Sequence, residues 1–289
     1  MTQALPVLWL YGPSGVGKTT AAWELCTRLW RDGVRAAYVD VDQMGMCYGP
    51  PTADNWAPEP VDDPGRHRIQ TANVNAVAAN LRDAGAACMV VSGVVDPEHG
   101  IDRTLLPDVD LTAVRLRADA DELRRRLVAR DRPGEPIEED LREAELMDRL
   151  TGPCIDTTGL IVDDVVRKID LPELADAAPH AVQAGELPGR ILWIRGPREG
   201  TRSVVGWQLY RQLRLSGTCA AYVDLVQLGL LRPADAADPG NRLLRAANLA
   251  AVWRAFRAAG AECLVVAEPL PGTEDGIPGS GGAFDGPIV

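Results

Sequence analysis

The sequence has little positive charge and no long apolar run. Lysine and arginine number 30 against 41 aspartates and glutamates, so the formal net charge is -11. Because nucleic acids and anionic membrane surfaces are held by clustered lysine and arginine, this charge argues against both as general partners. No apolar run approaches the roughly 18 residues of a membrane span, and no charged-then-apolar leader opens the chain. We therefore expect a cytoplasmic protein that binds neither nucleic acid nor membrane.

Paired cysteines at metal-binding spacing are also missing. The chain has six cysteines, none of them in a CxxC pair, and all lie within apolar patterns. Such a distribution predicts buried, reduced thiols and no zinc site. They are Cys26, Cys47, Cys88, Cys154, Cys219 and Cys263.

A glycine-rich segment, GPSGVGKT at residues 12–19, stands between an apolar run and a helical pattern. In this context glycines let backbone N–H groups turn toward phosphates, and the helix start adds a favourable dipole. Lys18 can neutralise phosphate charge, and the Thr19 hydroxyl can ligate Mg²⁺. The alternative is a chance glycine-rich turn. We predict a nucleoside triphosphate site formed by Gly12, Pro13, Ser14, Gly15, Val16, Gly17, Lys18, Thr19 and Thr20.

Two aspartates follow the next apolar run, at Asp40 and Asp42. Ligands of open α/β sheets gather beyond the carboxyl ends of the strands, so we expect an acceptor substrate beside them. A carboxylate there can accept the proton of an attacking hydroxyl during phosphoryl transfer, and Asp42 is the sharper candidate for this base. The alternative is that both are solvated acids or ligands of Mg²⁺-bound water.

Positive residues occur at two further places. A long proline-rich loop from residue 43 ends at Arg66, His67 and Arg68, where charge can hold a substrate or the moving phosphoryl group. Arg126 and Arg130 share a face of a later helix, and Arg132 follows it. These three can close over ATP and stabilise charge on the phosphoryl group in flight. Solvated helix surfaces are the alternative in both places.

Five strands separated by helices, with the glycine loop after the first, predict a P-loop α/β domain with a parallel five-stranded sheet. Residues 5–170 resemble the small-molecule kinases of the P-loop class, a group that includes shikimate and gluconate kinases, adenylylsulfate kinase and chloramphenicol phosphotransferase. The resemblance is carried by GPSGVGKTT, the VDVD strand end, the LRRRLVARDR helix and the DTTGL turn. The glycine cluster that shikimate kinases carry after the third strand is missing.

This resemblance implies Mg²⁺-ATP phosphotransfer to a hydroxyl, with the acid near Asp42 as base. Arg126 would then lie near the adenine, and Arg130 or Arg132 near the γ-phosphate. No motif selects one substrate.

The chain also resembles itself. Residues 10–25 align without a gap with residues 194–209, and RAAYVDVDQMG is answered by CAAYVDLVQLG. Such self-similarity predicts an internal duplication. Trp9 and Trp23 recur as Trp193 and Trp207, which predicts core positions. The chemical residues are lost, because Lys18 becomes Arg202, Asp42 becomes Val226 and Arg66 becomes Asn241.

We therefore predict a P-loop kinase-like domain at 1–170, a linker at 171–189, a truncated degenerate copy at 190–271 and a disordered tail at 272–289. The predicted function is an ATP-dependent kinase of a small hydroxylated metabolite. The alternative is a nucleotide-binding regulatory or scaffold protein. Because the copy has few helices to cover its strands, it should pack on the first domain or on a second chain, which makes a homodimer an open prediction.

Overall fold

The computed structural model describes residues 4–44, 46–48, 65–130, 137–175, 179–180, 182–196 and 199–269. Three predicted features therefore lie outside the described residues: Arg132, the tail at 272–289 and most of the loop that ends at Arg66. The backbone of Arg66 is described, but its side chain is not.

The first sheet contains the five predicted parallel strands and one additional strand. Its order is β6-β5-β1-β4-β2-β9. The strands are β1 (Leu5–Tyr11), β2 (Ala36–Asp40), β4 (Cys88–Gly93), β5 (Val109–Arg117), β6 (Cys154–Asp156) and β9 (Leu230–Arg232). The first five pair in parallel, whereas β9 is antiparallel to β2. The predicted α/β class with a parallel sheet is confirmed.

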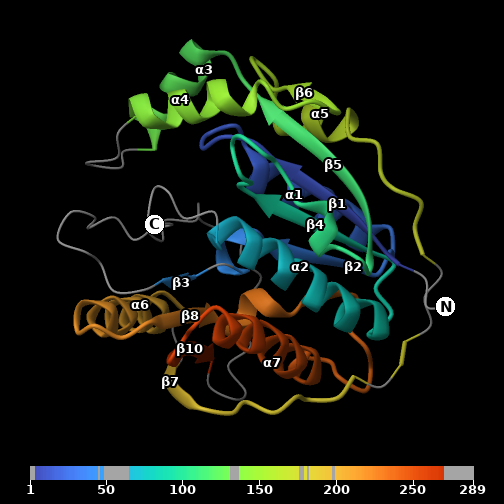
Figure 1. Cartoon of the computed structure of the whole chain (residues 1–289). Helices are drawn as coiled ribbons and strands as arrows, with labels where there is room; N and C mark the ends of the chain where they lie inside the picture. Colours follow the sequence, from blue (N-terminus) through green and yellow to red (C-terminus); the bar gives the residue numbers. More distant parts are fainter. Residues whose placement is uncertain are drawn as a thin grey trace.

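Helices flank this sheet, and most connect consecutive strands (Figure 1). They are α1 (Lys18–Arg31), α2 (Gly65–Asp83), α3 (Ala120–Ala129), α4 (Ile137–Met147) and α5 (Val162–Arg167), with short 3₁₀ turns η1 (Val41–Met44) and η2 (Arg103–Leu105). Buried residues on one sheet face pack with α1, and those on the other face pack with α2. Two covered faces explain why the central strands are continuous apolar runs.

The later part of the chain forms a second sheet of order β3-β8-β10-β7. Its members are β3 (Cys47–Tyr48), β8 (Ala220–Asp224), β10 (Cys263–Pro269) and β7 (Arg190–Gly196). The accompanying helices are α6 (Glu199–Leu215) and α7 (Arg242–Ala258), and η3 (Leu225–Leu228) follows β8. Strand β8 has the same sequence, AAYVD, as β2.

In each sheet, one of the two edge strands comes from the other part of the chain. Strand β9 pairs with β2, with Leu230 opposite Tyr38, and β3 pairs with β8, with Cys47 opposite Ala221. The two exchanged strands occupy corresponding places, because each follows a 3₁₀ turn that directly follows an AAYVD strand. The halves are therefore joined by main-chain pairing in both directions.

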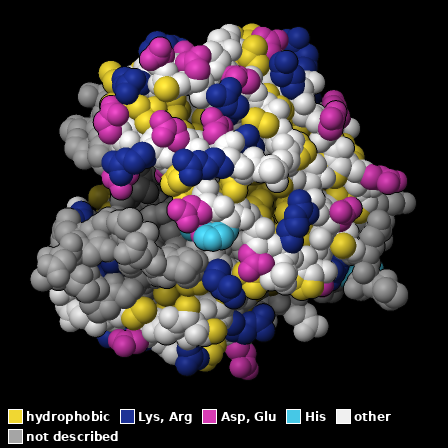
Figure 2. Space-filling view, turned by 45° about the horizontal axis from the view of Figure 1, so that its top comes forward, with side chains coloured by type: hydrophobic (Ala, Val, Ile, Leu, Met, Phe, Trp, Pro, Cys, Tyr) yellow, Lys and Arg dark blue, Asp and Glu magenta, His cyan; other side chains and the backbone are white. Residues whose placement is uncertain are grey.

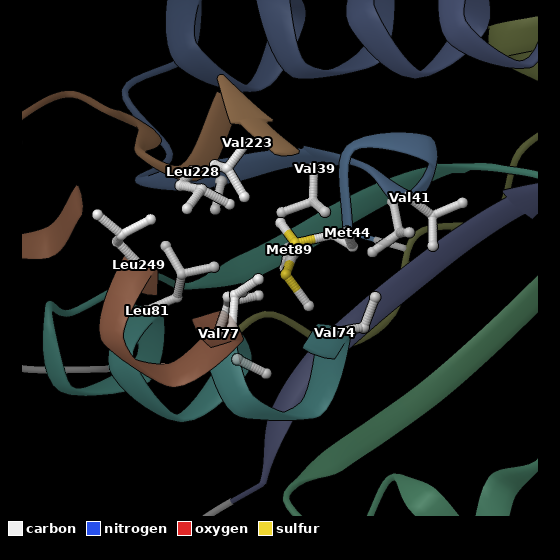
Figure 3. Packing of buried hydrophobic residues seen from close by; sticks show 14 of the residues in the cluster. Val39, Val41, Met44, Val74, Val77, Leu81, Met89, Val223, Leu228 and Leu249 are labelled. Carbon is white, nitrogen blue, oxygen red and sulfur yellow. The ribbon is translucent and has the colours of Figure 1, made fainter. Parts of the chain in front are cut away.

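One hydrophobic core crosses the boundary between the sheets. Figure 3 shows Val74, Val77 and Leu81 of α2 facing Val39, Val41, Met44 and Met89, beside Val223, Leu228 and Leu249 of the second half. All of these residues are buried members of one cluster. Helices α2 and α7 lie side by side at this boundary (Figure 1), and Asn80 Nδ2 donates to Asn248 Oδ1 at 2.9 Å.

A corresponding hydrogen bond joins α2 to η1 and α7 to η3. Asn73 Nδ2 of α2 donates to the Met44 carbonyl at 2.5 Å, and Asn248 Nδ2 of α7 donates to the Leu228 carbonyl at 2.6 Å. Both asparagines are almost fully buried, so each amide satisfies a main-chain acceptor that water does not reach.

Two burial predictions were wrong. Trp9 is 1% exposed, but Trp193 is 38% exposed, because β7 is an edge strand whereas β1 lies between two neighbours. The six cysteines are free thiols, but Cys154 is exposed because it lies on the edge strand β6, and Cys219 is only partly buried.

The surface carries mixed charge. Figure 2 shows lysine and arginine side chains interspersed with aspartate and glutamate on the face it presents. Within the described parts of the chain, no helix is long and apolar enough to cross a membrane.

Candidate functional site

The glycine-rich loop follows β1 and leads directly into α1, as predicted. Gly12, Gly15 and Gly17 have φ angles of 147°, 85° and 92°. A Cβ atom at Gly12 would collide with the Leu116 carbonyl oxygen, so β5 packs too closely for any side chain at this position. Gly17 is the N-cap of α1 and supplies no side-chain cap to the helix. These positive φ angles give the loop its inward curve, since only glycine adopts them readily.

The start of α1 suits an anion. No side chain caps it, and no acidic residue occurs in its first turn. The first N–H groups of a helix have no intrahelical acceptors and carry partial positive charge, so they favour phosphate. Thr19 and Thr20 in this turn are exposed. The residues of the predicted cradle thus fit a group of phosphates, with Lys18 at the base of the loop.

Lys18 is buried, and its Nζ donates to the Pro13 carbonyl at 2.9 Å. Burial lowers the pKa of this lysine, because an ammonium group loses solvation inside the protein. The carboxylates of Asp42 and Glu143 act in the opposite direction and raise the pKa. The structure therefore brings the P-loop lysine within electrostatic reach of the strand-end acids and of α4. The sequence analysis missed Glu143.

Asp40 and Asp42 both lie at the carboxyl end of β2. Asp40 is the last residue of the strand, and its Oδ1 accepts a hydrogen bond from the Asp42 N–H at 3.0 Å. Burial, and to a smaller extent the nearby negative charge of Asp42, raise the pKa of Asp40 to about 7. Asp42 lies one turn further, in η1, and is partly buried. Asp40 thus holds the turn that carries Asp42.

Arg126 connects the P-loop to the turn after β6. Its Nη2 donates to the Thr157 carbonyl at 2.8 Å, and its Nη1 donates to Thr157 Oγ1 at 3.0 Å. Glu122 accepts from Arg126 Nε at 2.7 Å, so the guanidinium is held on two sides. It lies beside the Val16 carbonyl of the loop, at 3.4 Å. Thr157, which is buried, was not predicted as a site residue.

The remaining predicted cations lie in different environments. Arg130, the C-cap of α3, is exposed, and its positive charge lowers the pKa of Lys18, so it lies within electrostatic reach of that lysine. Arg68 lies on the surface in an ion pair with Asp102 at 3.7 Å, with 64% of its side chain exposed. The structure thus groups Lys18, Asp40, Asp42 and Arg130, whereas the partner that it gives Arg68 is Asp102, on the surface.

The second half has the aligned positions in another arrangement. Arg202, aligned with Lys18, is buried, and its Nη1 lies 3.4 Å from the Gly196 carbonyl that accepts its hydrogen bond. Ser203 Oγ, aligned with the Thr19 hydroxyl, donates to Asp224 Oδ2 at 2.7 Å. Asp224 is aligned with Asp40, and its Oδ1 accepts from the Val226 N–H at 3.2 Å. The turn geometry recurs, but the hydroxyl and carboxylate are bonded to each other.

Comparisons with known proteins found several similar solved structures. Among solved structures, the chain is similar to the tunicamycin resistance protein of Deinococcus radiodurans (20% identity, 57% of this chain and 92% of that chain, TM-score 0.37). It is also similar to a gluconokinase from Sinorhizobium meliloti (15% identity, 57% of this chain and 90% of that chain, TM-score 0.38). A third similar structure is the shikimate kinase of Acinetobacter baumannii in complex with shikimate (22% identity, 57% of this chain and 90% of that chain, TM-score 0.36). Likenesses of this size do not identify a substrate.

No curated protein matches the chain significantly. A family model described as an AAA domain matches residues 7–152, which begins in β1 and includes the P-loop, both strand-end aspartates and the α3–α4 pair. Since this match extends over just over half of the sequence, the chain belongs to the AAA-domain family of P-loop proteins.

Proposed function

We propose that the chain is an ATP-dependent kinase that transfers a phosphoryl group to a hydroxyl of a small metabolite, with Mg²⁺ as cofactor. The observation that supports this best is the position of the buried Lys18, at the base of the loop and within electrostatic reach of the strand-end carboxylates Asp42 and Asp40. A phosphate-binding lysine beside carboxylates fits transfer between two bound substrates, because one group serves the nucleotide and the other serves the acceptor. Strand β4 ends in Ser92 and Gly93, without the aspartate that ends this strand in many ATPases.

In this proposal the loop amides and Lys18 hold the phosphates of ATP. Arg126 lies at the adenine side, and Arg130, together with Arg132, serves the γ-phosphate. Charge stabilisation by such fixed groups is the main contribution that a protein makes to phosphoryl transfer. Asp42 accepts the proton of the acceptor hydroxyl.

We assign Mg²⁺ to the space between Thr19 and Asp40. The second half supports this assignment, because there the aligned Ser203 hydroxyl donates directly to Asp224. Among the described hydrogen bonds of the first half, none joins Thr19 to Asp40, and Thr19 is exposed. A hydroxyl and a carboxylate are oxygen ligands of the kind that Mg²⁺ prefers.

We further propose that residues 1–170 form the kinase unit and that 190–271 form a degenerate copy of it, joined by 171–189. Three observations support the duplication: the shared AAYVD strands, the carboxylate-held turns after them, and the paired asparagine bonds to Met44 and Leu228.

The test is a mass-spectrometric screen of fractionated metabolites with Mg²⁺ and ATP. We expect a wild-type product that has gained one phosphate. Asp42→Asn should lower the rate about 10²-fold or more while ATP binding stays unchanged, since only the proton acceptor is removed. Tight ATP binding without product in any fraction would contradict the kinase proposal and favour a nucleotide-binding regulatory protein. A fully active Asp42→Asn variant would overturn the base assignment alone.

A further inference from the structure

Gln70 of α2 is a buried polar residue that the proposed reaction does not yet use. Its side chain is 2% exposed, and its Oε1 has no hydrogen-bond partner among the described residues. Buried amides in native proteins are nearly always bonded, because a lone acceptor in the interior loses its water without compensation. An amide that stays open in this way points to a ligand or to a functional constraint.

The position of Gln70 on α2 directs it toward the carboxyl edge of the first sheet. Residues 70, 74, 77 and 81 share one helical face, since their spacing follows the helical repeat. Val74, Val77 and Leu81 lie over the sheet, in the same buried cluster as Val41 (Figure 3). Gln70 lies one turn beyond Val74, toward the helix start. Asn73 of α2 donates to the Met44 carbonyl of η1, and Asp42 lies in the same 3₁₀ turn, so the start of α2 with Gln70 lies beside the turn that carries the proposed base.

The aligned residue in the second half differs in the way expected for a site that has been lost. Arg245 occupies the aligned position on α7, and its stem lies against Gly229 at the end of η3. The apolar face is otherwise retained, with Leu249, Val252 and Phe256 in the common core. The long side chain of Arg245 thus packs against the end of η3, whereas the aligned residue of the first half is the shorter glutamine.

We propose that Gln70 is a specificity-determining residue that hydrogen-bonds a neutral hydroxyl of the acceptor. This inference rests on the proposed kinase function and narrows its substrate class to neutral polyhydroxylated compounds. A hydroxyl can donate to Oε1, whereas a carboxylate cannot. The carboxylate of Asp42 at the same edge also repels an acidic acceptor, and the exposed Arg68 is paired with Asp102.

The experiment compares full-length wild type, Gln70→Met and Gln70→Glu, with Arg245→Met as the matched control. Each is assayed with Mg²⁺-ATP against neutral sugars, polyols and nucleosides, and against sugar acids. Wild type should phosphorylate neutral compounds. Gln70→Met, which keeps the side-chain length but loses the acceptor atom, should raise the acceptor KM at least about 10-fold with the ATP KM unchanged. Gln70→Glu should raise the acceptor KM more than Gln70→Met does, because Asp42 repels the added carboxylate. Arg245→Met should have the acceptor KM of wild type.

A second readout separates this role from a packing role. Removing an unpaired buried amide should raise the melting temperature of the ligand-free protein by about 2 °C or more. Gln70→Met with an unchanged acceptor KM overturns the inference, whatever its melting temperature. Wild-type turnover of sugar acids only would overturn the neutral substrate class while leaving the kinase function intact. A wild type that phosphorylates a compound in the fractionated metabolites but no neutral compound in the panel overturns this inference and leaves the kinase function intact.

Discussion

The two halves of this molecule hold the same turn after the same strand and differ in what surrounds it. In both, an aspartate at the strand end accepts the N–H two residues later, and a buried asparagine binds the turn from the helix above. Only the first half has a lysine in the loop and an acid within the turn, whereas the second has Arg202 and Val226. The turn and its asparagine bond thus recur in both halves, whereas the lysine and the acid of the proposed site occur in the first half alone.

The largest expected effect comes from removing the second half, by ending the chain at residue 170. The shared core would lose large buried residues such as Leu249, Trp253 and Phe256, each worth about 1.5–3 kcal/mol. Together such losses are comparable with the roughly 5–15 kcal/mol that stabilise a domain. We expect fragment 1–170 to aggregate or to melt far below the full chain in calorimetry, with ATP binding in any soluble fraction. A monomeric fragment as stable as the whole chain would show that the second half is an appendage.

The next effect tests whether the two aligned cations are equivalent. Lys18→Met should reduce phosphotransfer by about 10³-fold, because a fixed charge at the phosphates is lost. Arg202→Met is the matched change in the second half and should leave kcat and the ATP KM within about two-fold of wild type. Titration calorimetry with Mg²⁺-ATP should give one site per chain. Two equivalent sites, or equal losses in both variants, would contradict the division between the halves.

A third prediction concerns the pH dependence of stability through Asp40. Its pKa is raised to about 7 in the folded protein, from 3.8. The folded state therefore keeps a proton that the unfolded state has lost, and this group makes stability fall as pH rises from about 4 to about 7. Asp40→Asn should make stability less dependent on pH. The decrease in melting temperature from pH 5 to pH 8 should be smaller in this variant than in wild type, by at least about 3 °C.

The exposed Asp121 gives the control for this measurement, because Asp121→Asn alters a carboxylate in water. Parallel pH curves for wild type and Asp40→Asn would show that Asp40 titrates normally in the folded chain.

The smallest effect sharpens the contact between the halves. Asn80→Ala leaves Asn248 Oδ1 without the hydrogen bond that crosses from α2 to α7, and Asn248 is 1% exposed. We expect a loss of about 1–3 kcal/mol and a melting temperature lower by about 2–6 °C. Gln208→Ala, at an exposed position of α6, is the control. Identical melting of both variants would mean that this bond adds nothing to the joining of the halves.

Much of the first half could be read from sequence because its signals are local. The loop from Gly12 to Thr19 has fixed residues at fixed spacing, and each central strand is a continuous apolar run between turn residues. Asp40 and Asp42 could be placed at the strand end for the same reason. The neighbourhood of Lys18 and Glu143 could not, because it depends on how α4 folds back over the loop.

The strand exchange was beyond sequence reasoning. Strands β3 and β9 have two and three residues, too few to carry an alternating pattern. Their partners are more than a hundred residues away in the chain, and pairing at that separation leaves no local mark. The exposure of Trp193 has the same origin, since a residue type reveals core preference but not whether its strand has a neighbour on both sides. Gln70 had a readable signal, a polar residue within an apolar helical stripe.

The pairing of β2 with β9 also sets the order of events during synthesis. A ribosome delivers β2 early, but its partner strand follows roughly 190 residues later, which at about 5–20 residues per second means on the order of 10 to 40 seconds. During that interval the outer edge of β2 presents unpaired N–H and C=O groups, a template on which another nascent chain can add a strand. The half that carries the P-loop therefore completes its sheet only after residues 230–232 have been made.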